Sequence, residues 1–441
     1  MRPSSSPSEP AGLFDGVLAA GGVRAEVGDA AWVRALLDAE AALARAAARA
    51  GLASHADAEA VAAACAALVV DPGELGAEAA GTGNPVVPLI TRLRAAVPGD
   101  AAGLVHRGAT SQDIVDTAAM LVARRALEPL LADLGAATGL VVALAREHRG
   151  TLVAGRTLLQ QALPTTFGLI AAGWLTGLDT AHRRLAEVRD HRLAAQLGGA
   201  AGTLAAYAPE SGIAMLAAYS AELGLAEPEL PWHTERTRIA ELAAALGTAA
   251  GAIAKVARDL VLHAQTEVGE VAEGGDDGGS STLPHKHNPI RAISACAAAA
   301  QAPGLVATLL STMAHEHQRA AGGWHAEWLP LRALLSCTGS AAFQLRAALD
   351  GLRVDAGRMR ANLELTHGAL LAERVAAALA PALGDRASAV VRAAAARGDL
   401  AADPEITAHL DPARLAALLD PGGYVGSAGA LIDRALRAAA R

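Results

Sequence analysis

Apolar residues recur along residues 234–273 at alternating steps of three and four. This spacing is a sustained heptad repeat, which is typical of a helix that packs along its length against other helices. The apolar positions are Ile239, Leu242, Leu246, Ala249, Ile253, Val256 and Leu260. At a rise of about 1.5 Å per residue, roughly 40 residues would form a rod of roughly 60 Å, which needs long neighbours. The pattern therefore predicts one helix over 234–273 inside a bundle.

Four further stretches have helical patterns long enough to be those neighbours. They are residues 112–148, 165–195, 290–320 and 327–353. Shorter helices are expected at 30–50 and 56–68, with turns over 71–83, and the chain beyond residue 354 is helical but less regular. We therefore expect an all-α fold, with a central bundle of five long helices flanked by smaller N- and C-terminal helical domains. The expected domain bounds are 1–110, 111–353 and 354–441.

Three polar stretches interrupt the helical pattern, each at an end of a long predicted helix. They span residues 106–113, 155–166 and 278–289. Loops on a rigid scaffold commonly carry catalytic and binding groups. If the helices form a bundle, such loops meet only at the ends of the bundle or between neighbouring copies of the chain. We therefore expect the chemistry of the chain to lie in these three stretches.

The stretch 278–289 reads Gly-Gly-Ser-Ser-Thr-Leu-Pro-His-Lys-His-Asn-Pro. Its glycines permit close approach of the backbone, Ser280 and Ser281 supply hydroxyls, and Lys286 supplies an ammonium. Of the 37 Lys and Arg residues, only Lys255 and Lys286 are lysines. An ammonium is a compact charge with rotating donors, whereas a guanidinium is a fixed fork. The stretch predicts an anion site with a proton carrier, and a solvated glycine-rich surface loop is the alternative.

The stretch 106–113 precedes a long predicted helix. Thr110 or Ser111 can cap that helix, and Asp113 falls in its first turn, where negative charge suits the helix dipole. Free amides at a helix start also favour a bound anion, so the same residues are candidates for binding a carboxylate. Capping accounts for Ser111 and Asp113 but not for His106. Upstream, the segment 81–85 either presents Asn84 or forms a simple turn.

Composition and charge exclude several classes of protein. The chain has 441 residues, is 52% hydrophobic and 2% aromatic, and carries a net charge of −8. That charge leaves no basic surface for nucleic acid. Three cysteines, at Cys65, Cys296 and Cys337, fit a reduced cytoplasmic protein better than a disulfide framework. The first ten residues contain no secretory apolar run, and 292–314 is too polar in composition for a membrane span.

Several histidines lie in or after the third stretch and raise the question of a metal site. They are His285, His287, His315, His317 and His325. They are scattered, and Glu316 is the one carboxylate at a ligand-like offset, so we expect no metal. His106 and His325 are instead candidates for hydrogen bonding to a substrate, with a packed or surface histidine as the alternative.

The three polar stretches resemble the three signature regions of the fumarase/aspartase superfamily. Residues 279–289 match its hallmark loop at Gly, Ser, Ser, Pro, Lys, Asn and Pro. Further similarity, which covers nearly the whole chain, is to the superfamily's bacterial cycloisomerase branch. It rests on His106-Arg-Gly-Ala-Thr-Ser-Gln-Asp, Gly155-Arg-Thr-Leu-Leu-Gln-Gln-Ala-Leu-Pro, Gly322-Gly-Trp-His-Ala-Glu-Trp and Gly426-Ser-Ala-Gly. The resemblance implies a cofactor-free enzyme that forms a homotetramer with active sites shared between subunits.

The resemblance also implies a role for individual residues. Ser280 would carry the proton, with Ser281 as the substitute, and Lys286 and Asn288 would hold a substrate carboxylate. The other substrate-binding positions implied are Asn84, Arg107, Thr110, Ser111, Thr157, Gln160 and His325, and His106 is a further catalytic candidate. The substrate would be a small polycarboxylate.

The activity that the resemblance implies is the reversible cycloisomerisation of 3-carboxy-cis,cis-muconate to a carboxymuconolactone in protocatechuate degradation. The family's C–N lyases typically carry a histidine after the threonine of the second region, where this chain has Leu158. A nitrogen leaving group benefits from protonation, whereas a carboxylate oxygen is already stable as an anion. Adenylosuccinate lyase is the alternative enzyme, and a non-catalytic helical scaffold is the alternative from another class.

Overall fold

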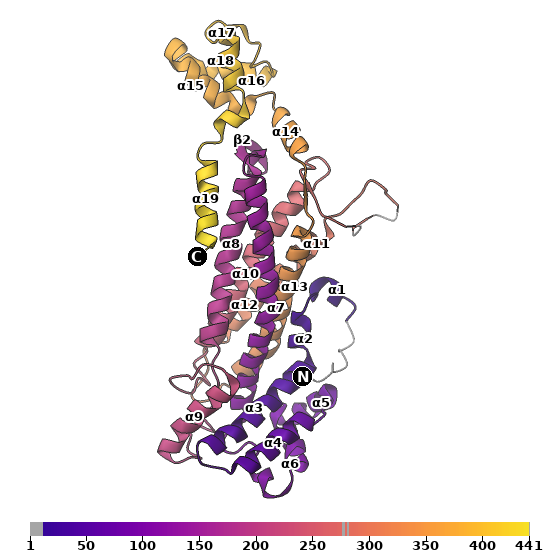
Figure 1. Ribbon diagram of the computed structural model, residues 1–441, viewed down its shortest axis with the longest axis vertical. Helices are drawn as coiled ribbons and strands as arrows, with labels where there is room; N and C mark the ends of the chain where they lie inside the picture. Colours follow the sequence, from indigo (N-terminus) through magenta and orange to yellow (C-terminus); the bar gives the residue numbers. More distant parts are fainter. Residues whose placement is uncertain (1–11, 276–277, 280–281, 441) are drawn as a thin grey trace. The chain divides into compact units, whose positions relative to one another are not determined.

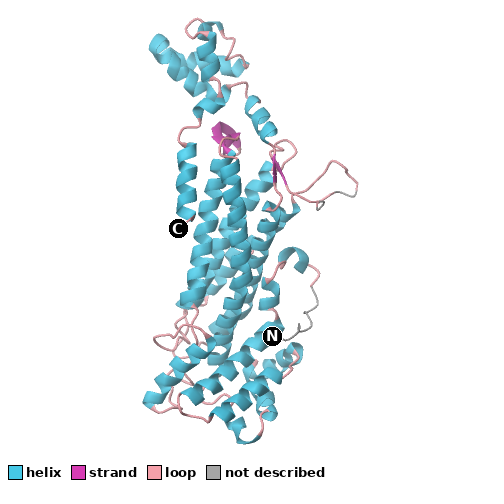
Figure 2. Ribbon diagram, viewed as in Figure 1, coloured by secondary structure: helices cyan, strands magenta, loops and turns pink. Residues whose placement is uncertain are grey.

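The structure of the chain is a computed structural model that describes residues 12–440, except 276–277 and 280–281. Helices make up most of these residues, and strands occur within them only as two short two-stranded antiparallel sheets (Figures 1 and 2). The prediction of an all-α fold is confirmed.

The chain divides into two compact units, each assembled from three segments of the sequence. Unit 1 contains residues 1–134, 181–254 and 294–344, and unit 2 contains residues 135–180, 255–293 and 345–441. Five helices have residues in both units: α7 (Ser111–Glu147), α8 (Phe167–Glu187), α10 (Thr237–His263), α11 (Ile290–Ala299) and α13 (Gly323–Leu349). The three-domain division stays a prediction.

The other elements of unit 1 are mainly short helices. They are α1 (Asp15–Leu18), α2 (Val23–Val27), α3 (Asp29–Arg49), α4 (His55–Ala67), α5 (Pro72–Thr82), α6 (Val86–Ala96), the 3-10 helix η1 (Gly99–Leu104), the π-helix η2 (Val188–Arg192), α9 (Pro209–Leu223) and α12 (Ala302–Ser311). Helix α3 packs against both α4 and α9. Its buried residues are mostly alanine and leucine, which allows close helix packing.

The other elements of unit 2 include all four strands. They are β1 (Leu152–Thr157), β2 (Gln160–Thr166), β3 (Val271–Ala272), β4 (Arg353–Val354), α14 (Ala356–Glu364), η3 (Ala369–Leu371), α15 (Ala372–Leu383), η4 (Gly384–Arg386), α16 (Ala387–Arg397), α17 (Pro404–Thr407), α18 (Pro412–Leu418), η5 (Pro421–Tyr424) and α19 (Ala428–Ala439). Strands β1 and β2 pair with each other, and β3 pairs with β4. The C-terminal helices have an apolar core that includes Val375, Leu379, Val391 and Leu410.

The heptad positions of α10 are confirmed, but the predicted length of the helix is wrong. All seven seam residues from Ile239 to Leu260 are at most 1% exposed. The helix ends at His263 rather than at residue 273. Gly269 turns the chain at a φ of +60°, and the Glu270 N–H donates to the His263 carbonyl at 2.9 Å. The chain therefore leaves the helical path and forms β3.

The turns predicted over 71–83 are instead helix α5. The Asp71 side chain accepts a hydrogen bond from the Glu74 N–H at 2.9 Å, and Pro72 is the first helical residue. An aspartate cap followed by proline is a helix start, because proline lacks only an N–H that the first turn does not need. Gly83, at a φ of +76°, ends the helix.

The single helix predicted over 290–320 is two helices, α11 and α12. Pro303 lies in the first turn of α12. In the middle of a continuous helix, a proline would remove a hydrogen bond and clash with the preceding turn. By contrast, α7 runs through Pro129 without ending. The five-helix bundle thus has its fourth member broken near residue 300.

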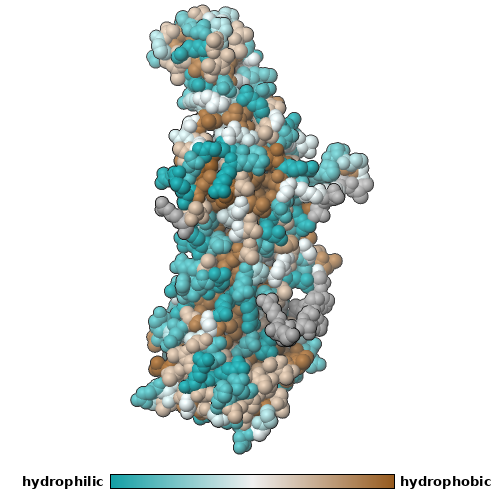
Figure 3. Space-filling model, in the orientation of Figure 1, coloured by the Kyte–Doolittle hydropathy of each residue, from teal (hydrophilic) through white to brown (hydrophobic). Residues whose placement is uncertain are grey.

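Much of the apolar surface of the long helices is not covered within one chain. Three helical stretches of the described chain are long and apolar enough to cross a membrane by length and composition alone, namely Ser111–Glu147, Thr237–His263 and Ile290–Ser311. The expectation that 292–314 is too polar in composition for a span is therefore wrong, because its many alanines and leucines outweigh its few polar residues. Only 33% of the most apolar window of Ile290–Ser311 is buried. Figure 3 shows apolar side chains between polar ones on the surface of the chain. Part of the apolar surface of these helices is therefore exposed on the single chain.

Candidate active site

His106, in the loop between η1 and α7, is held by a buried carboxylate. Its φ is +61°, which is uncommon for a residue with a side chain. Glu40, in α3, accepts the backbone N–H of His106 through Oε2 at 3.1 Å, and its Oε1 lies 2.7 Å from Nδ1. The Glu40 residue is 1% exposed. Glu40 therefore fixes both the backbone and the ring of His106.

The residues after His106 fold against Tyr207. A Cβ on Gly108 would lie 2.4 Å from Tyr207 Cζ, so only glycine fits there. The Tyr207 hydroxyl donates to the Arg107 carbonyl at 2.5 Å, and burial raises the pKa of Tyr207 to about 12, which keeps it a donor at neutral pH. The Arg107 guanidinium donates to the Leu52 carbonyl at 3.1 Å. Arg107 makes no hydrogen bond with another predicted site side chain among the described residues.

Asp113, fully buried in the first turn of α7, joins three segments of unit 1. It accepts from Thr110 N at 2.9 Å, Gly198 N at 3.0 Å, Gly199 N at 2.9 Å and His233 Nε2 at 2.6 Å. The hydroxyls of Thr110 and Ser111 make no hydrogen bond within the part of the chain that the structure describes. Asp113 thus caps the helix without using either hydroxyl.

A buried ion cluster lies next to this helix start. Arg236 donates to Asp116 of α7 at 2.8 and 3.1 Å and to Glu327 of α13, and the Trp324 Nε1–H donates to Asp116 at 3.0 Å. Burial opposes the charge of Arg236, but the two carboxylates outweigh this effect and raise its pKa above the ordinary value. Burial raises the pKa of Glu327. The cluster fixes α7 relative to α13 within unit 1.

Asn84 and His325 are neighbours in unit 1. The His325 Nε2–H donates to the Gly83 carbonyl at 3.0 Å, next to Asn84. The Asn84 Oδ1 accepts the Val86 N–H at 3.1 Å, and its Nδ2 donates to the Thr82 carbonyl at 3.4 Å. Local hydrogen bonds therefore occupy Asn84, which forms the turn before α6.

The second signature region is a β-hairpin. Thr157 pairs with Gln160, and Leu158 and Leu159 form the two-residue tip. Both leucines have positive φ, 51° and 64°, where hairpins usually place asparagine or glycine. They are 97% and 69% exposed. The hairpin therefore presents two apolar side chains between two predicted substrate-binding residues.

Glu270, 0% exposed, anchors this hairpin within unit 2. It accepts both arms of Arg156 at 2.8 and 2.7 Å and lies 2.6 Å from His263 Nδ1. The Asn362 Nδ2 donates to it at 2.8 Å, and the Gln161 Nε2 donates to the Asn362 carbonyl at 2.9 Å. Both strands of the hairpin are thereby tied to the same cluster.

In the third signature region, Ser280 and Ser281 lie outside the described residues. Asn288 donates to the Gly278 carbonyl twice, from its backbone N–H at 3.0 Å and from Nδ2 at 2.9 Å. Glu273 accepts the N–H groups of Arg291 and Ala292 at 3.1 and 2.7 Å, at the start of α11. These bonds close the neck of the 278–289 loop, and Lys286 is exposed on it.

The predicted site residues form two groups. Unit 1 holds Asn84, His106, Arg107, Thr110, Ser111 and His325, and unit 2 holds Thr157, Gln160, Lys286 and Asn288. Within unit 2, Thr157 and Gln160 make no hydrogen bond with Lys286 or Asn288, all of which are described residues. The structure thus shows how each region is built within its own unit.

Three residues that shape these regions have no counterpart in the sequence predictions. They are Glu40, His233 and Glu270. His233 and Glu270 meet partners more than 90 residues away, at Asp113 and Asn362, so local patterns cannot find these contacts. Glu40 could have been noticed in the sequence, because it is an acidic residue on the apolar face of a predicted helix, between Leu36 and Leu43.

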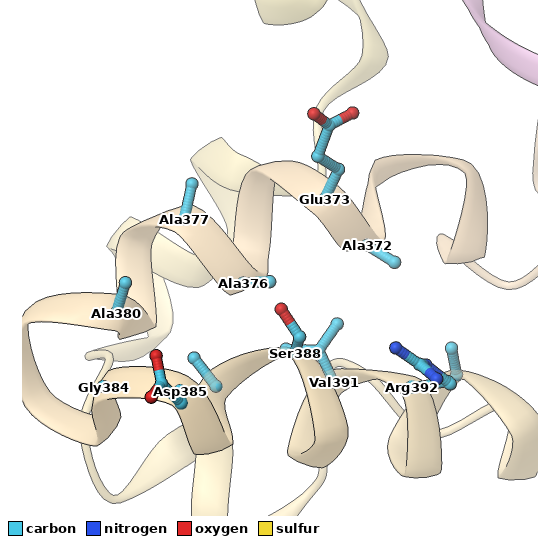
Figure 4. Close-up of a pocket in the computed structure, with 12 residues that line it drawn as sticks. Ala372, Glu373, Ala376, Ala377, Ala380, Gly384, Asp385, Ser388, Val391 and Arg392 are labelled. Carbon is cyan, nitrogen blue, oxygen red and sulfur yellow. The ribbon is translucent and has the colours of Figure 1, made fainter.

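Among the described residues, neither a metal cluster nor the groove beside α15 marks the site. No group of three or more His, Cys, Asp or Glu side chains among the described residues could hold a metal ion. A groove of about 680 Å³ lies between α15 and α16 (Figure 4). Alanines are half of the residues that line it, Glu373, Asp385, Ser388 and Arg392 are its polar lining, and it contains no predicted site residue.

Comparisons with known proteins give one consistent family. The model of the lyase family matches residues 23–304. The 3-carboxy-cis,cis-muconate cycloisomerase of Bradyrhizobium diazoefficiens is 44% identical over 439 residues, which cover 96% of this chain and 97% of the relative. The nitrosuccinate lyase of Streptomyces davaonensis is 46% identical over 447 residues, which cover 96% and 94%.

A solved structure agrees with these relatives. The crystal structure of the 3-carboxy-cis,cis-muconate lactonizing enzyme from Pseudomonas putida superposes with a TM-score of 0.91 at 40% identity, covering 97% of this chain and 99% of that one. The signature regions, the helical fold and full-length similarity thus agree. The chain therefore belongs to the lyase family and has the fold of the fumarase/aspartase superfamily.

Proposed function

We propose that the chain is a cofactor-independent cycloisomerase that interconverts 3-carboxy-cis,cis-muconate and a carboxymuconolactone in protocatechuate degradation. The observation that carries this proposal is 44% identity to a cycloisomerase along nearly the whole of both chains. The signature loop also contains Ser280, Lys286 and Asn288, which supports an intact catalytic loop.

The chemistry of the proposed reaction is an intramolecular addition and its reverse. In the forward direction, a substrate carboxylate oxygen bonds to a carbon of the diene, and the neighbouring carbon takes a proton from Ser280. The intermediate is a dianion in which charge is delocalised onto a carboxylate. Fixed donors and cations aimed at that charge lower the barrier. Lys286 with Asn288, and Thr110 with Ser111, are proposed to bind substrate carboxylates, as are Thr157 and Gln160.

Leu158 supports a leaving group that needs no protonation. It stands at the hairpin tip between Thr157 and Gln160 and is 97% exposed. Its side chain cannot donate a proton, so an elimination at this site has no acid from the second region. A carboxylate oxygen leaves as a stable anion, and lactone opening therefore remains possible. The comparisons do not favour the adenylosuccinate lyase alternative, whose leaving nitrogen benefits from protonation.

Nitrosuccinate elimination is a second candidate because of the 46% identity to a nitrosuccinate lyase. Eliminating the nitro group from nitrosuccinate would leave fumarate and nitrite. Nitrite, like a carboxylate, is a stable anion, so Leu158 is compatible with this reaction too. A non-catalytic scaffold is the weakest alternative, since the chain keeps the whole signature loop.

We also propose a cytoplasmic homotetramer whose active sites combine residues from different copies. The exposed Leu158 and Leu159 and the uncovered apolar faces of the long helices support helix packing between copies. Exposed apolar surface of this extent usually marks an interaction site. The proposal assigns this surface to other copies of the chain rather than to a membrane.

The test is turnover by the purified protein. With 3-carboxy-cis,cis-muconate, diene absorbance should fall and a lactone should form, while nitrosuccinate should release no nitrite and adenylosuccinate no fumarate. Ser280→Ala should reduce kcat by at least about 10³-fold with unchanged oligomer size. Nitrite release without lactone formation would overturn the choice of reaction, and full activity of Ser280→Ala would transfer the proton to another residue such as Ser281.

A further inference from the structure

Glu40 is a buried acid with one partner residue. Its side chain is 0% exposed, and its neighbours on the buried side of α3 are alanines and leucines. Both of its hydrogen bonds go to His106, and no Lys or Arg within the described part of the chain pairs with it. A buried carboxylate is costly unless it is paired and hydrogen-bonded, so this placement demands a reason.

Glu40 determines how the His106 ring is protonated and oriented. Oε1 lies 2.7 Å from Nδ1, and an ionised carboxylate only accepts hydrogen bonds, so an ionised Glu40 selects the tautomer with the proton on Nδ1. The other ring nitrogen, Nε2, makes no hydrogen bond to any described residue. The side chain is 14% exposed, which leaves a path for a ligand. The same carboxylate also holds the His106 backbone in its positive-φ conformation.

We infer that Glu40 is a positioning residue, which fixes His106 so that Nε2 faces the bound polycarboxylate beside Thr110 and Ser111. This inference rests on the proposed function, because it takes His106 to contact substrate. A carboxylate bonded to Nδ1–H that sets the tautomer and angle of a histidine is a recurring arrangement in active sites. Losing the carboxylate partner of a metal-ligating histidine typically lowers activity about 10- to 100-fold, and we adopt that range for Glu40.

A double-mutant cycle tests whether Glu40 acts through His106. Glu40→Gln keeps the size of the side chain, but it replaces one of the two accepting oxygens, Oε1 and Oε2, with an NH2 group that only donates. We expect Glu40→Gln to lower kcat about 10- to 100-fold, with KM changed less. Adding Glu40→Gln to His106→Asn should cause no further loss, because the ring that Glu40 positions is already absent.

The matched control is Asp38→Asn, on the same helix. Asp38 accepts from Arg34 and Arg125 and does not contact His106. The kcat of Asp38→Asn should equal that of the wild type. Losses from Glu40→Gln and His106→Asn that multiply in the double variant, or wild-type kcat in Glu40→Gln, would overturn the inference.

A second measurement determines the protonation of the His106 ring directly and does not require a Glu40 variant that folds. Solid-state ¹⁵N spectra are recorded of the wild type and of His106→Asn, both labelled at histidine. The difference between the two spectra gives the ring nitrogen signals of His106. We expect a protonated Nδ1, and a His106 signal with Nε2 protonated and Nδ1 bare would overturn the inference. Failure of the proposed function is distinguishable, since the wild type would then turn over no muconate while the ring state of His106 would still be measured.

Discussion

At the residue scale, the chain uses buried carboxylates to position functional loops. Glu40 holds His106, Asp113 holds the start of α7 against His233, and Glu270 holds the second-region hairpin. Each has 0% side-chain exposure and accepts at least two hydrogen bonds. Because removing one member of a buried charged network leaves the others unpaired, these sites should be sensitive to substitution.

Glu270→Gln should destabilise the fold in a pH-dependent way. Burial raises the pKa of Glu270, but hydrogen bonds from His263, Arg156 and Asn362 outweigh it and bring the pKa to about 2. The unfolded value is about 4.3, so the stabilisation is complete above that pH and is lost as pH falls towards 2. We expect the variant to lose about 3 kcal/mol of unfolding free energy at pH 7.

Denaturant unfolding of both proteins between pH 3 and 7 measures this difference. The gap between wild type and Glu270→Gln should narrow as the pH falls. Glu59→Gln, an exposed partner of Arg45, serves as the control and should unfold like the wild type. A gap that stays constant with pH would contradict the assignment of the stabilisation to the ionised Glu270.

The role of a residue could be predicted from the sequence only when the residues it acts with stand close to it in the chain. Ser280, Lys286 and Asn288 could be proposed from sequence because they stand together in one unusual stretch. Glu270 could not, since it depends on Arg156 and Asn362, far away in the chain. Asn288 shows a further limit, because its side chain donates to the Gly278 carbonyl, a contact that a residue type alone does not reveal.

At the element scale, the neck of the 278–289 loop depends on one glycine. Gly278 has a φ of +86°, and a Cβ there would lie 2.2 Å from the Asn288 carbonyl oxygen. That separation is far shorter than a van der Waals contact. One atom is a Cβ and the other is a backbone oxygen, so rotating a side chain cannot relieve the clash. The backbone at the neck would have to move.

Gly278→Ala should therefore disrupt catalysis more than stability. We expect kcat to fall at least tenfold, on the order of the loss from a displaced catalytic group, while Tm changes little because the loop contributes little core. Gly279→Ala is the control, since a Cβ there meets nothing within 4 Å. Calorimetry and steady-state kinetics measure both effects. Equal losses in the two variants would contradict a specific role for the neck.

Helices could be predicted where their apolar spacing or their capping residues can be read from a short stretch of sequence. The heptad seam of α10 is buried at every position, and α3 and α4 lie within a residue of the expected bounds. Helix α5 was missed because Asp71-Pro-Gly is also typical of turns. The hairpin of β1 and β2 was missed because Leu158 and Leu159 carry no turn signal.

At the scale of the whole molecule, the proposed active site requires several copies of the chain. The proposed site needs His106 from the first region, Thr157 from the second and Ser280 from the third. In the proposed homotetramer these regions come from different copies, which also cover the apolar faces of α7, α10 and α11. Sequence predicts the helices of such an assembly, but pairing between copies depends on surfaces that only folding creates.

Mixing two variants of strongly reduced activity tests this central claim most directly. His106→Asn and Ser280→Ala are each purified, confirmed as tetramers whose turnover is far below a quarter of wild type, unfolded together in equal amounts and refolded. If each site takes residues 106 and 280 from different copies, about a quarter of the sites regain both native residues. Muconate turnover should then recover to about a quarter of wild type. A refolded mixed tetramer with no recovered activity would contradict shared active sites.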